Sequence, residues 1–361
     1  MQWLKSLLGL RDTADHLLTT EPSNPAQDAL TAISHLSRAM KIQQGAVEIC
    51  SALGNLYRLR GELDRAIQIR GAIIDRPDLD PVDRAQVFFE LGRDYSRAGI
   101  LDRARDAFTR CRELGSHTPA LELELALLSA KSGDFLEASR QYHKIGLAPQ
   151  AAHYLVRAAS SKDGTMHPGL LQEAKEMYAA SPEAWLESIV LLVQREAWVD
   201  LLSQLDQGLS AVGSDLAFLL LDPLLDHTET GTPSAALLPL EHLDTLLHIV
   251  NRQPQNLALL FYSGCLLRAH GRIEEAKTWQ EKALLLNPSF WPARLELLTM
   301  SLPQQQMTPV FEMQLDFLLR RARQVKRFIC SRCGLKRGQI FFCCPKCHSW
   351  HSIAFRQLIT D

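Results

Sequence analysis

Small and large apolar residues recur at fixed offsets along this chain, and the offsets predict paired helices. In the first copy a small residue is followed by an aromatic residue after three positions, a turn glycine after seven and an alanine after twelve. These residues are Gly54, Tyr57, Gly61 and Ala66. The small residue, the turn glycine and the alanine recur in three further copies, which start at Gly92, Ala126 and Gly264. Such self-similarity indicates repeated helix–turn–helix units.

The offsets are those of the tetratricopeptide repeat (TPR), and each position has a physical reason. The first small residue lets the two helices of a unit approach closely, with the alanine opposite it. The turn glycine ends the first helix because glycine adopts the left-handed conformation without strain. Large residues such as Tyr57 and Phe108 fill the space between units, and Pro288 ends the unit that begins at Gly264. We therefore predict an all-α fold, a TPR-type α-solenoid.

The repeat pattern weakens in the middle of the chain and is replaced by other signals at its end. Between Pro149 and Pro254 it stays helical but irregular, and Asp222-Pro223, Gly231-Thr232-Pro233 and Pro239 predict an irregular connection. Five segments follow from the pattern. They are 1–43, an N-terminal segment with a capping helix; 44–148, regular TPR units; 149–253, degenerate helical repeats; 254–324, a TPR unit with C-terminal helices; and 325–361, a small C-terminal module.

The first helix of each unit lines the concave face of such an array. Four polar side chains fall on outward positions of the first two units: Asn55, Arg58, Arg93 and Arg97. They predict a partner-binding groove for an acidic or carboxylate-bearing peptide. In the alternative interpretation the arginines are solvated or pair with neighbouring acids such as Glu90 and Asp94.

Composition shows a folded chain with a strongly uneven charge. The 361 residues are 46% hydrophobic and 22% charged, and the net charge is -2. From Phe317 to Thr360, however, ten Lys and Arg residues occur without any Asp or Glu, so that the rest of the chain carries 29 basic and 41 acidic residues, a net of -12. The basic segment could dock on the acidic repeats, or attract nucleic acid or anionic lipid. Docking explains both charges without a third molecule, and we favour it.

Two Cys-x2-Cys pairs in the C-terminal module carry the most specific chemistry of the sequence. The pairs are Cys330 with Cys333 and Cys344 with Cys347, and ten residues separate them. Four thiolates on two such knuckles can converge tetrahedrally on one metal ion, which leaves no open coordination position and indicates a structural role. We predict one zinc ion in a rubredoxin-like zinc-ribbon module, with iron as the alternative because four thiolates also suit it.

Neighbouring residues leave some ambiguity in this ligand set. Cys343 would form a four-residue step with Cys347, unlike the three-residue step of the other pair, so we expect it not to be a ligand. His348 and His351 are further candidates, but four thiolates already complete the shell. Structural disulfides are the other interpretation, which a reducing compartment disfavours. The aromatic residues of the module, among them Phe328 and Phe355, are expected to form its core and its contact with the repeats.

At this point the sequence resembles a known family, the lipopolysaccharide assembly protein B family. The resemblance is carried by LGNLYRLRGELDRAI (53–67), LGRDYSRAGILDRARDAF (91–108) and CSRCG…CPKCHSW (330–350). It implies a cytoplasmic adaptor at the inner membrane of Gram-negative bacteria. Such an adaptor links a membrane-bound AAA+ protease to the deacetylase that commits precursor to lipid A, and so restrains lipopolysaccharide synthesis. It also implies that the four cysteines of the two pairs are the metal ligands.

We expect the start of the chain to depart from that family, because its amino-terminal transmembrane helix is not recognisable in Met1–Arg11. No signal peptide and no apolar run of membrane-spanning length is visible. We expect Met1–Arg11 to be a capping helix or a short interfacial anchor. A cytoplasmic location with reduced thiols follows, and membrane contact would be peripheral at most.

The sequence contains no recognisable catalytic motif. A P-loop, a Gly-x-Ser-x-Gly elbow, a His-Glu-x-x-His pair and a dinucleotide fingerprint are all missing. We therefore expect a binding protein, not an enzyme, that contacts protein partners through the concave face of its repeats. A nucleic-acid-binding zinc-ribbon protein and an iron-binding electron carrier are the competing hypotheses, and we do not expect nucleic acid among the partners.

Overall fold

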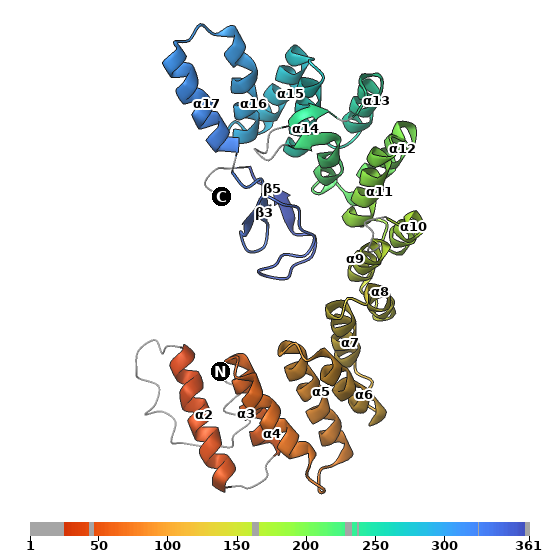
Figure 1. The fold of residues 1–361 in the computed structure, drawn as a ribbon, viewed down its shortest axis with the longest axis vertical. Coiled ribbons are helices and arrows are strands. Elements are labelled where there is room, and N and C mark those ends of the chain that lie inside the picture. The colour runs from red at the N-terminus through yellow and green to blue at the C-terminus, as the bar shows by residue number, and fades with distance from the viewer. Residues whose placement is uncertain are drawn as a thin grey trace. The chain divides into compact units, whose positions relative to one another are not determined.

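The computed structural model describes residues 25–42, 47–160, 166–227, 233–236, 238–323 and 325–357. These residues form mainly helices, with short strands near residue 230 and at the C-terminal end (Figure 1). The chain divides into two compact units, Met1–Gly133 and Asp134–Asp361. The predicted capping helix or anchor at Met1–Arg11 lies outside the described residues. The five predicted segments stay a prediction.

The first unit is built from helices that pack against their neighbours in sequence. They are α2 (Pro25–Ile42), α3 (Val47–Leu59), α4 (Leu63–Ile74), α5 (Pro81–Arg97), α6 (Leu101–Glu113) and α7 (Pro119–Lys131). The pairs α3–α4 and α5–α6 are the first two predicted repeats. Their turn glycines, Gly61 and Gly99, have φ of 81° and 77°, the left-handed region that the sequence analysis assigned to them.

Close approach within each pair depends on the first glycine of the repeat. A Cβ atom at Gly92 would lie 2.5 Å from Cε1 of Phe108, the residue sixteen positions later. At Gly54 the corresponding neighbour is Arg70, whose Nη1 atom would lie 2.9 Å away. Both large side chains are completely buried. The glycine thus makes room for one long side chain of the second helix, which the offsets alone did not reveal for Arg70.

The second unit is also built mainly from helices and ends in a small sheet. Its helices are α8 (Phe135–Lys144), α9 (Ala148–Ala159), α10 (Pro168–Met177), α11 (Pro182–Gln194), α12 (Trp198–Val212), α13 (Leu240–Asn251), α14 (Leu257–Ala269), α15 (Ile273–Leu286), α16 (Trp291–Ser301) and α17 (Pro309–Arg323). Between α12 and α13 lie the 3₁₀ turns η2 (Ala217–Leu220) and η3 (Asp222–Leu224) and the antiparallel pair β1 (Leu225–His227) and β2 (Pro233–Ala236). The connection there is irregular, as predicted. A further 3₁₀ turn, η4 (Leu302–Gln304), follows α16.

The C-terminal module is a three-stranded antiparallel sheet with the order β4-β3-β5. Its strands are β3 (Phe328–Cys330), β4 (Lys336–Arg337) and β5 (Ile353–Phe355), with Phe328 opposite Phe355 and Cys330 opposite Ile353. Alternation along β3 and β5 places these four residues on one face, and they belong to the same buried cluster as side chains from α11 to α16. The module and the repeats therefore share one core.

These elements confirm the predicted fold class. Paired helices with the TPR offsets are followed by a small cysteine-bearing β module, as the sequence indicated. Among the described residues, no helix combines the length and the hydropathy needed to cross a bilayer.

The packing at Gly92 predicts opposite effects for two glycine substitutions in the first unit. Gly92→Ala should lower the free energy of unfolding by about 1–3 kcal/mol, because the added methyl group overlaps Phe108. Gly71→Ala, in helix α4 with no atom within 4 Å of the new methyl group, should instead raise it by up to about 1 kcal/mol. Urea unfolding followed by circular dichroism measures both. Equal effects of the two substitutions would contradict the close-approach argument.

Candidate functional site

The four cysteines of the two knuckles bring their sulfur atoms together within the C-terminal module. All four atoms lie within 4.8 Å of one another, so the group could hold a metal ion. The Sγ atoms of Cys330 and Cys347 are 3.7 Å apart, and those of Cys333 and Cys344 are 3.6 Å apart. Thiolates at the usual 2.3 Å around a tetrahedral zinc ion lie about 3.8 Å from one another. The spacing therefore fits a tetrahedral four-thiolate site.

The two knuckles have the same local backbone structure. In the first, the amide of Gly334 donates to the carbonyl of Cys330 at 2.9 Å; in the second, the amide of His348 donates to the carbonyl of Cys344 at 2.8 Å. Both residues after the turn have positive φ, 71° at Gly334 and 56° at His348. At His348 a side chain adopts the same left-handed conformation, so the second knuckle repeats the first without a glycine.

Hydroxyl and amide groups beside two of the four sulfur atoms, those of Cys330 and Cys347, favour the thiolate form that binds metals. Burial disfavours ionisation of Cys330, but the Ser352 hydroxyl and the Cys333 amide hydrogen-bond its sulfur and lower its pKa to about 6. The Ser352 Oγ atom is 3.3 Å from that sulfur. At Cys347 the pKa is lowered by the side chain and the backbone of Ser349, whose Oγ atom is also 3.3 Å from the sulfur. Such partners orient and support metal-bound cysteines.

The remaining candidates from the sequence lie outside this sulfur group. Cys343 forms an isolated bridge with Trp350, and its thiol faces the carbonyl of His348 at 3.7 Å. Burial raises the pKa of Cys343, which disfavours a thiolate there. His351 is occupied by a carboxylate of the repeats, Glu183, instead of by the sulfur group.

Aromatic side chains form the main contact between the module and the repeats. The ring of Phe355 lies 5.8 Å from that of Phe218 and 5.4 Å from that of Phe261, measured between ring centroids. The ring of Phe328 lies 6.0 Å from that of Phe218. Phe328 is completely buried. The two phenylalanines thus serve as core and contact residues, as the sequence indicated, and are not free to stack on bases.

A buried carboxylate forms the second contact. Glu183, at the start of α11, accepts hydrogen bonds from His153 of α9 and His351 of the module, at 3.1 Å and 3.0 Å. This group was not predicted from the sequence, because its members are separated by 30 and 168 residues. Of the basic residues near the C-terminus, Arg327 forms an ion pair with the repeats, at 3.2 Å from Asp222. Docking therefore combines aromatic rings, the Glu183 carboxylate and one ion pair from the basic segment, of which the sequence predicted only the last kind.

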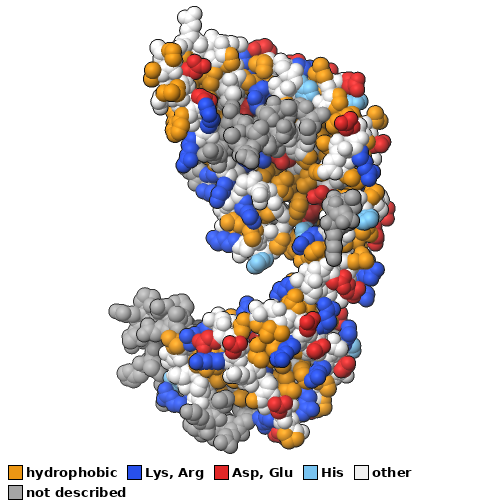
Figure 2. All heavy atoms as spheres, viewed as in Figure 1, with side chains coloured by type: hydrophobic (Ala, Val, Ile, Leu, Met, Phe, Trp, Pro, Cys, Tyr) orange, Lys and Arg blue, Asp and Glu red, His pale blue; other side chains and the backbone are white. Residues whose placement is uncertain are grey.

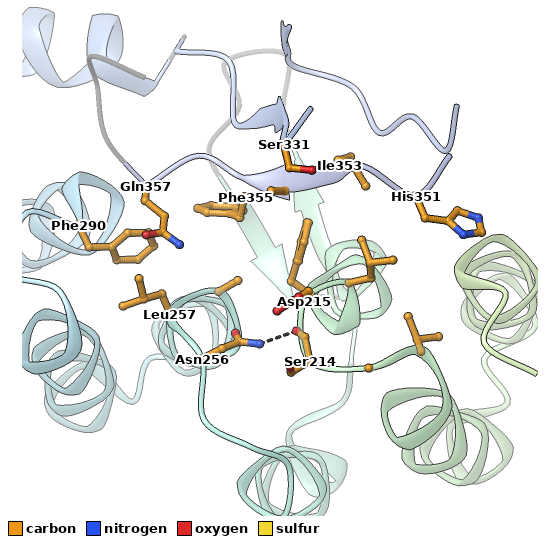
Figure 3. Close-up of a pocket in the computed structure, with 16 residues that line it drawn as sticks. Ser214, Asp215, Asn256, Leu257, Phe290, Ser331, His351, Ile353, Phe355 and Gln357 are labelled. Carbon is orange, nitrogen blue, oxygen red and sulfur yellow. Dashed lines mark hydrogen bonds between the residues drawn. The ribbon is translucent and has the colours of Figure 1, made fainter. Parts of the chain in front are cut away.

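Phe355 and His351, one residue from each contact, line a cavity of about 550 Å³ between the module and the repeats. Figure 3 shows Phe355 and His351 on the same wall, with Ile353 between them. The opposite wall comes from the loop after α12 and the start of α14, where the Asn256 side chain donates to the carbonyl of Ser214. The module is thus held at two separate places, Phe355 in β5 and His351 two residues before that strand, which fixes its orientation.

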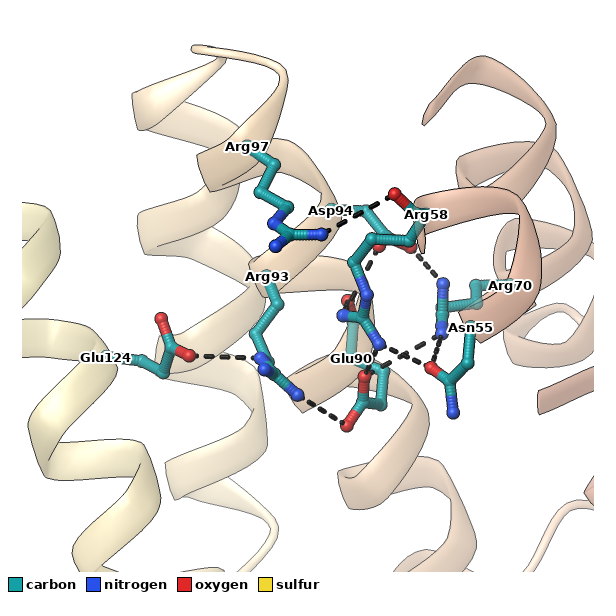
Figure 4. A network of polar contacts seen from close by, with 8 residues as sticks. All are labelled: Asn55, Arg58, Arg70, Glu90, Arg93, Asp94, Arg97 and Glu124. Carbon is teal, nitrogen blue, oxygen red and sulfur yellow. Dashed lines mark hydrogen bonds and ion pairs between the residues drawn. The ribbon is translucent and has the colours of Figure 1, made fainter. Parts of the chain in front are cut away.

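In the first unit, two of the predicted partner-binding residues belong to an internal polar network (Figure 4). Arg58 is buried, not outward-facing as expected, and pairs with Glu90 and Asp94 of the next repeat. Arg70 of helix α4 pairs with the same Asp94. Its guanidinium group also donates a hydrogen bond to the Asn55 side chain, at 2.6 Å. The acids of α5 draw both guanidinium groups inward because a buried carboxylate is stable only when it is paired.

The other two predicted residues remain at the surface. The Arg93 side chain is 41% exposed and pairs with Glu90 at 3.3 Å and Glu124 at 3.0 Å. Arg97 is exposed, and its Nη1 atom is 3.5 Å from the carbonyl of Arg58. Both side chains lie on the same side of α5 (Figure 4). The acid pairing of the alternative interpretation is thus present at Arg93, while a partner-binding role for Arg93 and Arg97 stays a prediction.

The Glu183 contact predicts a specific acid sensitivity. Burial opposes ionisation of Glu183, but hydrogen bonds from His153 and His351 outweigh it and lower its pKa from 4.5 to about 2. Its stabilisation is therefore complete above pH 4.5 and lost as the pH falls toward 2, and amounts to about 3 kcal/mol. Glu183→Gln should lower the free energy of unfolding at pH 7 and flatten its decline below pH 4.5.

Glu187, one turn further along α11, provides the matched control. Burial raises the pKa of Glu187, so its charge opposes folding at neutral pH. Glu187→Gln should therefore keep or increase stability at pH 7 and leave the acid-induced decline in place. Thermal unfolding between pH 3 and pH 7 compares the variants. Identical pH profiles for the Glu183 variant and the wild type would contradict the assigned role.

Comparison with known proteins gives a sequence relationship over part of the chain. No family model matches it. Lipopolysaccharide assembly protein B from Escherichia coli K12 is 44% identical over 71 residues, which cover 20% of this chain and 18% of that protein. The same protein from Escherichia coli O6:H1 and O157:H7 gives the same values. The matched segment thus spans about a fifth of the length of these curated relatives.

Solved structures give matches to helical repeat proteins. YrrB, described as a TPR protein with an unusual peptide-binding site, matches over 72% of this chain and 95% of its own, with 16% identity and a TM-score of 0.24. A tetratricopeptide repeat protein from Parabacteroides merdae matches over 72% of this chain and 99% of its own, with 13% identity and a TM-score of 0.35. With its repeats and its cysteine cluster, the chain resembles lipopolysaccharide assembly protein B.

Proposed function

We propose that this protein is a non-enzymatic adaptor whose TPR repeats bind protein partners and whose C-terminal module is held together by one metal ion. The observation that carries the proposal is the four-sulfur group on a module docked to helical repeats. The TPR fold and the likeness to an assembly protein support an adaptor role. Repeat arrays present extended surfaces for recognition, and a closed metal site supplies stability, not reactivity.

The metal in this proposal is one zinc ion bound by Cys330, Cys333, Cys344 and Cys347. Four thiolates satisfy the tetrahedral preference of zinc completely, and a module of this size gains much of its folding energy from the ion. Iron in the same site would give visible absorption and the chemistry of an electron carrier. A colourless protein with one equivalent of zinc would separate the two.

The partners follow from the likeness to lipopolysaccharide assembly protein B. We infer that the protein links a membrane-bound AAA+ protease to the deacetylase that commits precursor to lipid A, and so regulates lipopolysaccharide synthesis. It would act in the cytoplasm, at the inner face of the membrane. The proposed groove on the first unit includes Arg93 and Arg97, whose guanidinium groups suit a carboxylate-bearing segment.

Loss of the metal should abolish partner binding while the helices persist. Cys330→Ser removes a buried ligand, so the protein should lose its metal and its affinity for the deacetylase and the protease, with most of its helicity retained. Cys343→Ser is the matched control, since it changes the neighbouring thiol outside the sulfur group. Metal analysis, circular dichroism and pull-down with both partners measure the outcome. Full partner binding by a metal-free Cys330 variant would refute the role of the module.

The groove is tested separately from the metal. Arg93→Ala combined with Arg97→Ala should weaken partner binding roughly tenfold or more, because each guanidinium forms charge-assisted hydrogen bonds worth about 1.5–3 kcal/mol. Arg65→Ala removes an equally charged, 64% exposed side chain from α4, in the second helix of its repeat, and should leave binding unchanged. Titration calorimetry with the deacetylase measures the difference, and equal affinities of both variants would exclude this groove.

A further inference from the structure

The helix α17, which ends the helical array, leaves an apolar face uncovered in the part of the chain that the structure describes. Five of its large apolar side chains are between 57% and 68% exposed: Val310, Phe311, Met313, Phe317 and Leu318. Among its described side chains Leu319 alone is buried. Single exposed apolar residues are ordinary, but five on one helix form a patch of the kind that marks a contact surface.

The five side chains lie on one side of the helix. At 100° per residue they cover an arc of about 160°, which also contains the exposed Gln314 and Arg321, and Leu319 lies outside that arc. The acids of the helix, Glu312 and Asp316, fall on the opposite side by the same spacing, and Asp316 is paired with Arg320. Terminal helices of repeat arrays usually present a polar outer face, which keeps the array in solution. The apolar face of α17 is therefore a candidate binding surface.

Basic side chains without an acidic partner follow this helix. These side chains are exposed or half-exposed, and none of them forms an ion pair with a described residue. They are Lys326, Arg332, Lys336, Arg337 and Lys346. In Figure 2, hydrophobic and basic side chains gather side by side over α17 and the C-terminal module. No Asp or Glu occurs between Phe317 and Thr360 to offset them. The occupant of the apolar face should therefore be anionic.

We propose that α17 and these five basic residues form a membrane-contact surface for anionic phospholipid. An amphipathic helix of this kind lies in the plane of the membrane with its aromatic and aliphatic side chains among the acyl chains. Nearby Lys and Arg residues then meet the anionic head groups. The inference rests on the proposed location at a membrane face, and it adds a surface that neither the metal site nor the groove contains.

Charge and shape favour lipid over two other occupants. A second copy of this chain would place two basic surfaces against each other, and their repulsion opposes self-association through α17. A folded acidic protein would match the charge. However, the five basic residues are spread over strand β4 and the loops around both knuckles, beyond the helix itself. A diffuse charge beside an exposed apolar helix suits a fluid layer of head groups better than a fixed set of carboxylates.

The test is co-sedimentation of the zinc-loaded full chain with phospholipid vesicles. Vesicles of phosphatidylcholine with about a third phosphatidylglycerol should bind the protein, and pure phosphatidylcholine vesicles should bind it at least roughly tenfold more weakly. Binding to the anionic vesicles should fall as salt rises, because the charges of the protein and the head groups are screened over about 10 Å at 0.1 M ionic strength.

Substitutions of exposed residues separate the helix from the fold. Phe311→Ser combined with Phe317→Ser should lower vesicle affinity by about tenfold or more, since both rings leave the acyl layer. Leu285→Ser combined with Val199→Ser removes side chains that are 83% and 73% exposed elsewhere in the same unit, and should leave affinity unchanged. Lys336→Gln combined with Arg337→Gln should lower it by about fivefold for each charge.

Three outcomes would overturn the proposal of a membrane-contact surface. It fails when the protein does not bind the anionic vesicles at low salt, or when the double phenylalanine variant binds them as well as the wild type. A dimer in solution that the same variant dissociates would assign the face to a second copy. Pull-down of the deacetylase in the absence of lipid reports on the adaptor function separately, because the α17 variants should retain it.

Discussion

The contact of Phe328 and Phe355 with the rings of Phe218 and Phe261 is the interaction on which the candidate site depends. The described part of the module, residues 325–357, is too short to bury enough apolar surface by itself, so it requires both a metal and a neighbouring surface. The metal would hold the two knuckles together, and the rings hold the module on the repeats. Neither the metal nor the aromatic contact is sufficient by itself. Without the metal the two knuckles would not be held together, and without the aromatic rings the module would have no fixed orientation on the repeats.

The repeats form the surface on which the module docks, and their helix pairs pack in the same way as those of the first unit. In both, a small residue of the first helix makes room for a long side chain of the second. In α14 the small residue of the repeat, Gly264, lies against Gln280, whose amide nitrogen donates to the carbonyl of Phe261 at 3.1 Å. In the first unit the corresponding position is filled by Phe108 or by Arg70. One glycine can therefore admit an aromatic ring, an amide or a guanidinium group. The offsets preserve the helix pairing, while the long side chain decides what each pair contacts.

This difference explains what the sequence could and could not predict. The repeats and the knuckles were predictable because their defining residues lie within a few turns of one another, as Gly92 and Ala104 or Cys330 and Cys333 do. Burial of Arg58 was not, since it depends on acids of the next repeat that are 32 and 36 residues away. The bond from His351 to Glu183 joins residues 168 positions apart. Nothing local to either residue distinguishes it from an ordinary surface side chain.

The basic surplus near the C-terminus takes part in docking through the ion pair of Arg327 with Asp222, and it also leaves other basic side chains at the surface. The surplus of basic residues beyond Phe317 suggested attraction to the acidic repeats, and Arg327 does pair with Asp222 there. Aromatic rings and the Glu183 carboxylate add contacts that charge did not predict, and five of the basic residues form no ion pair with a described residue. Positive charge that is not paired within the fold produces an electrostatic potential at the surface, which extends into solvent over about a Debye length. The same segment begins within α17, whose apolar face is also left uncovered. The exposed apolar face of α17 and the unpaired basic residues are neighbours in sequence. A partner that contacts both must offer apolar groups to the helix and anionic groups to the Lys and Arg side chains, as a layer of anionic phospholipid does.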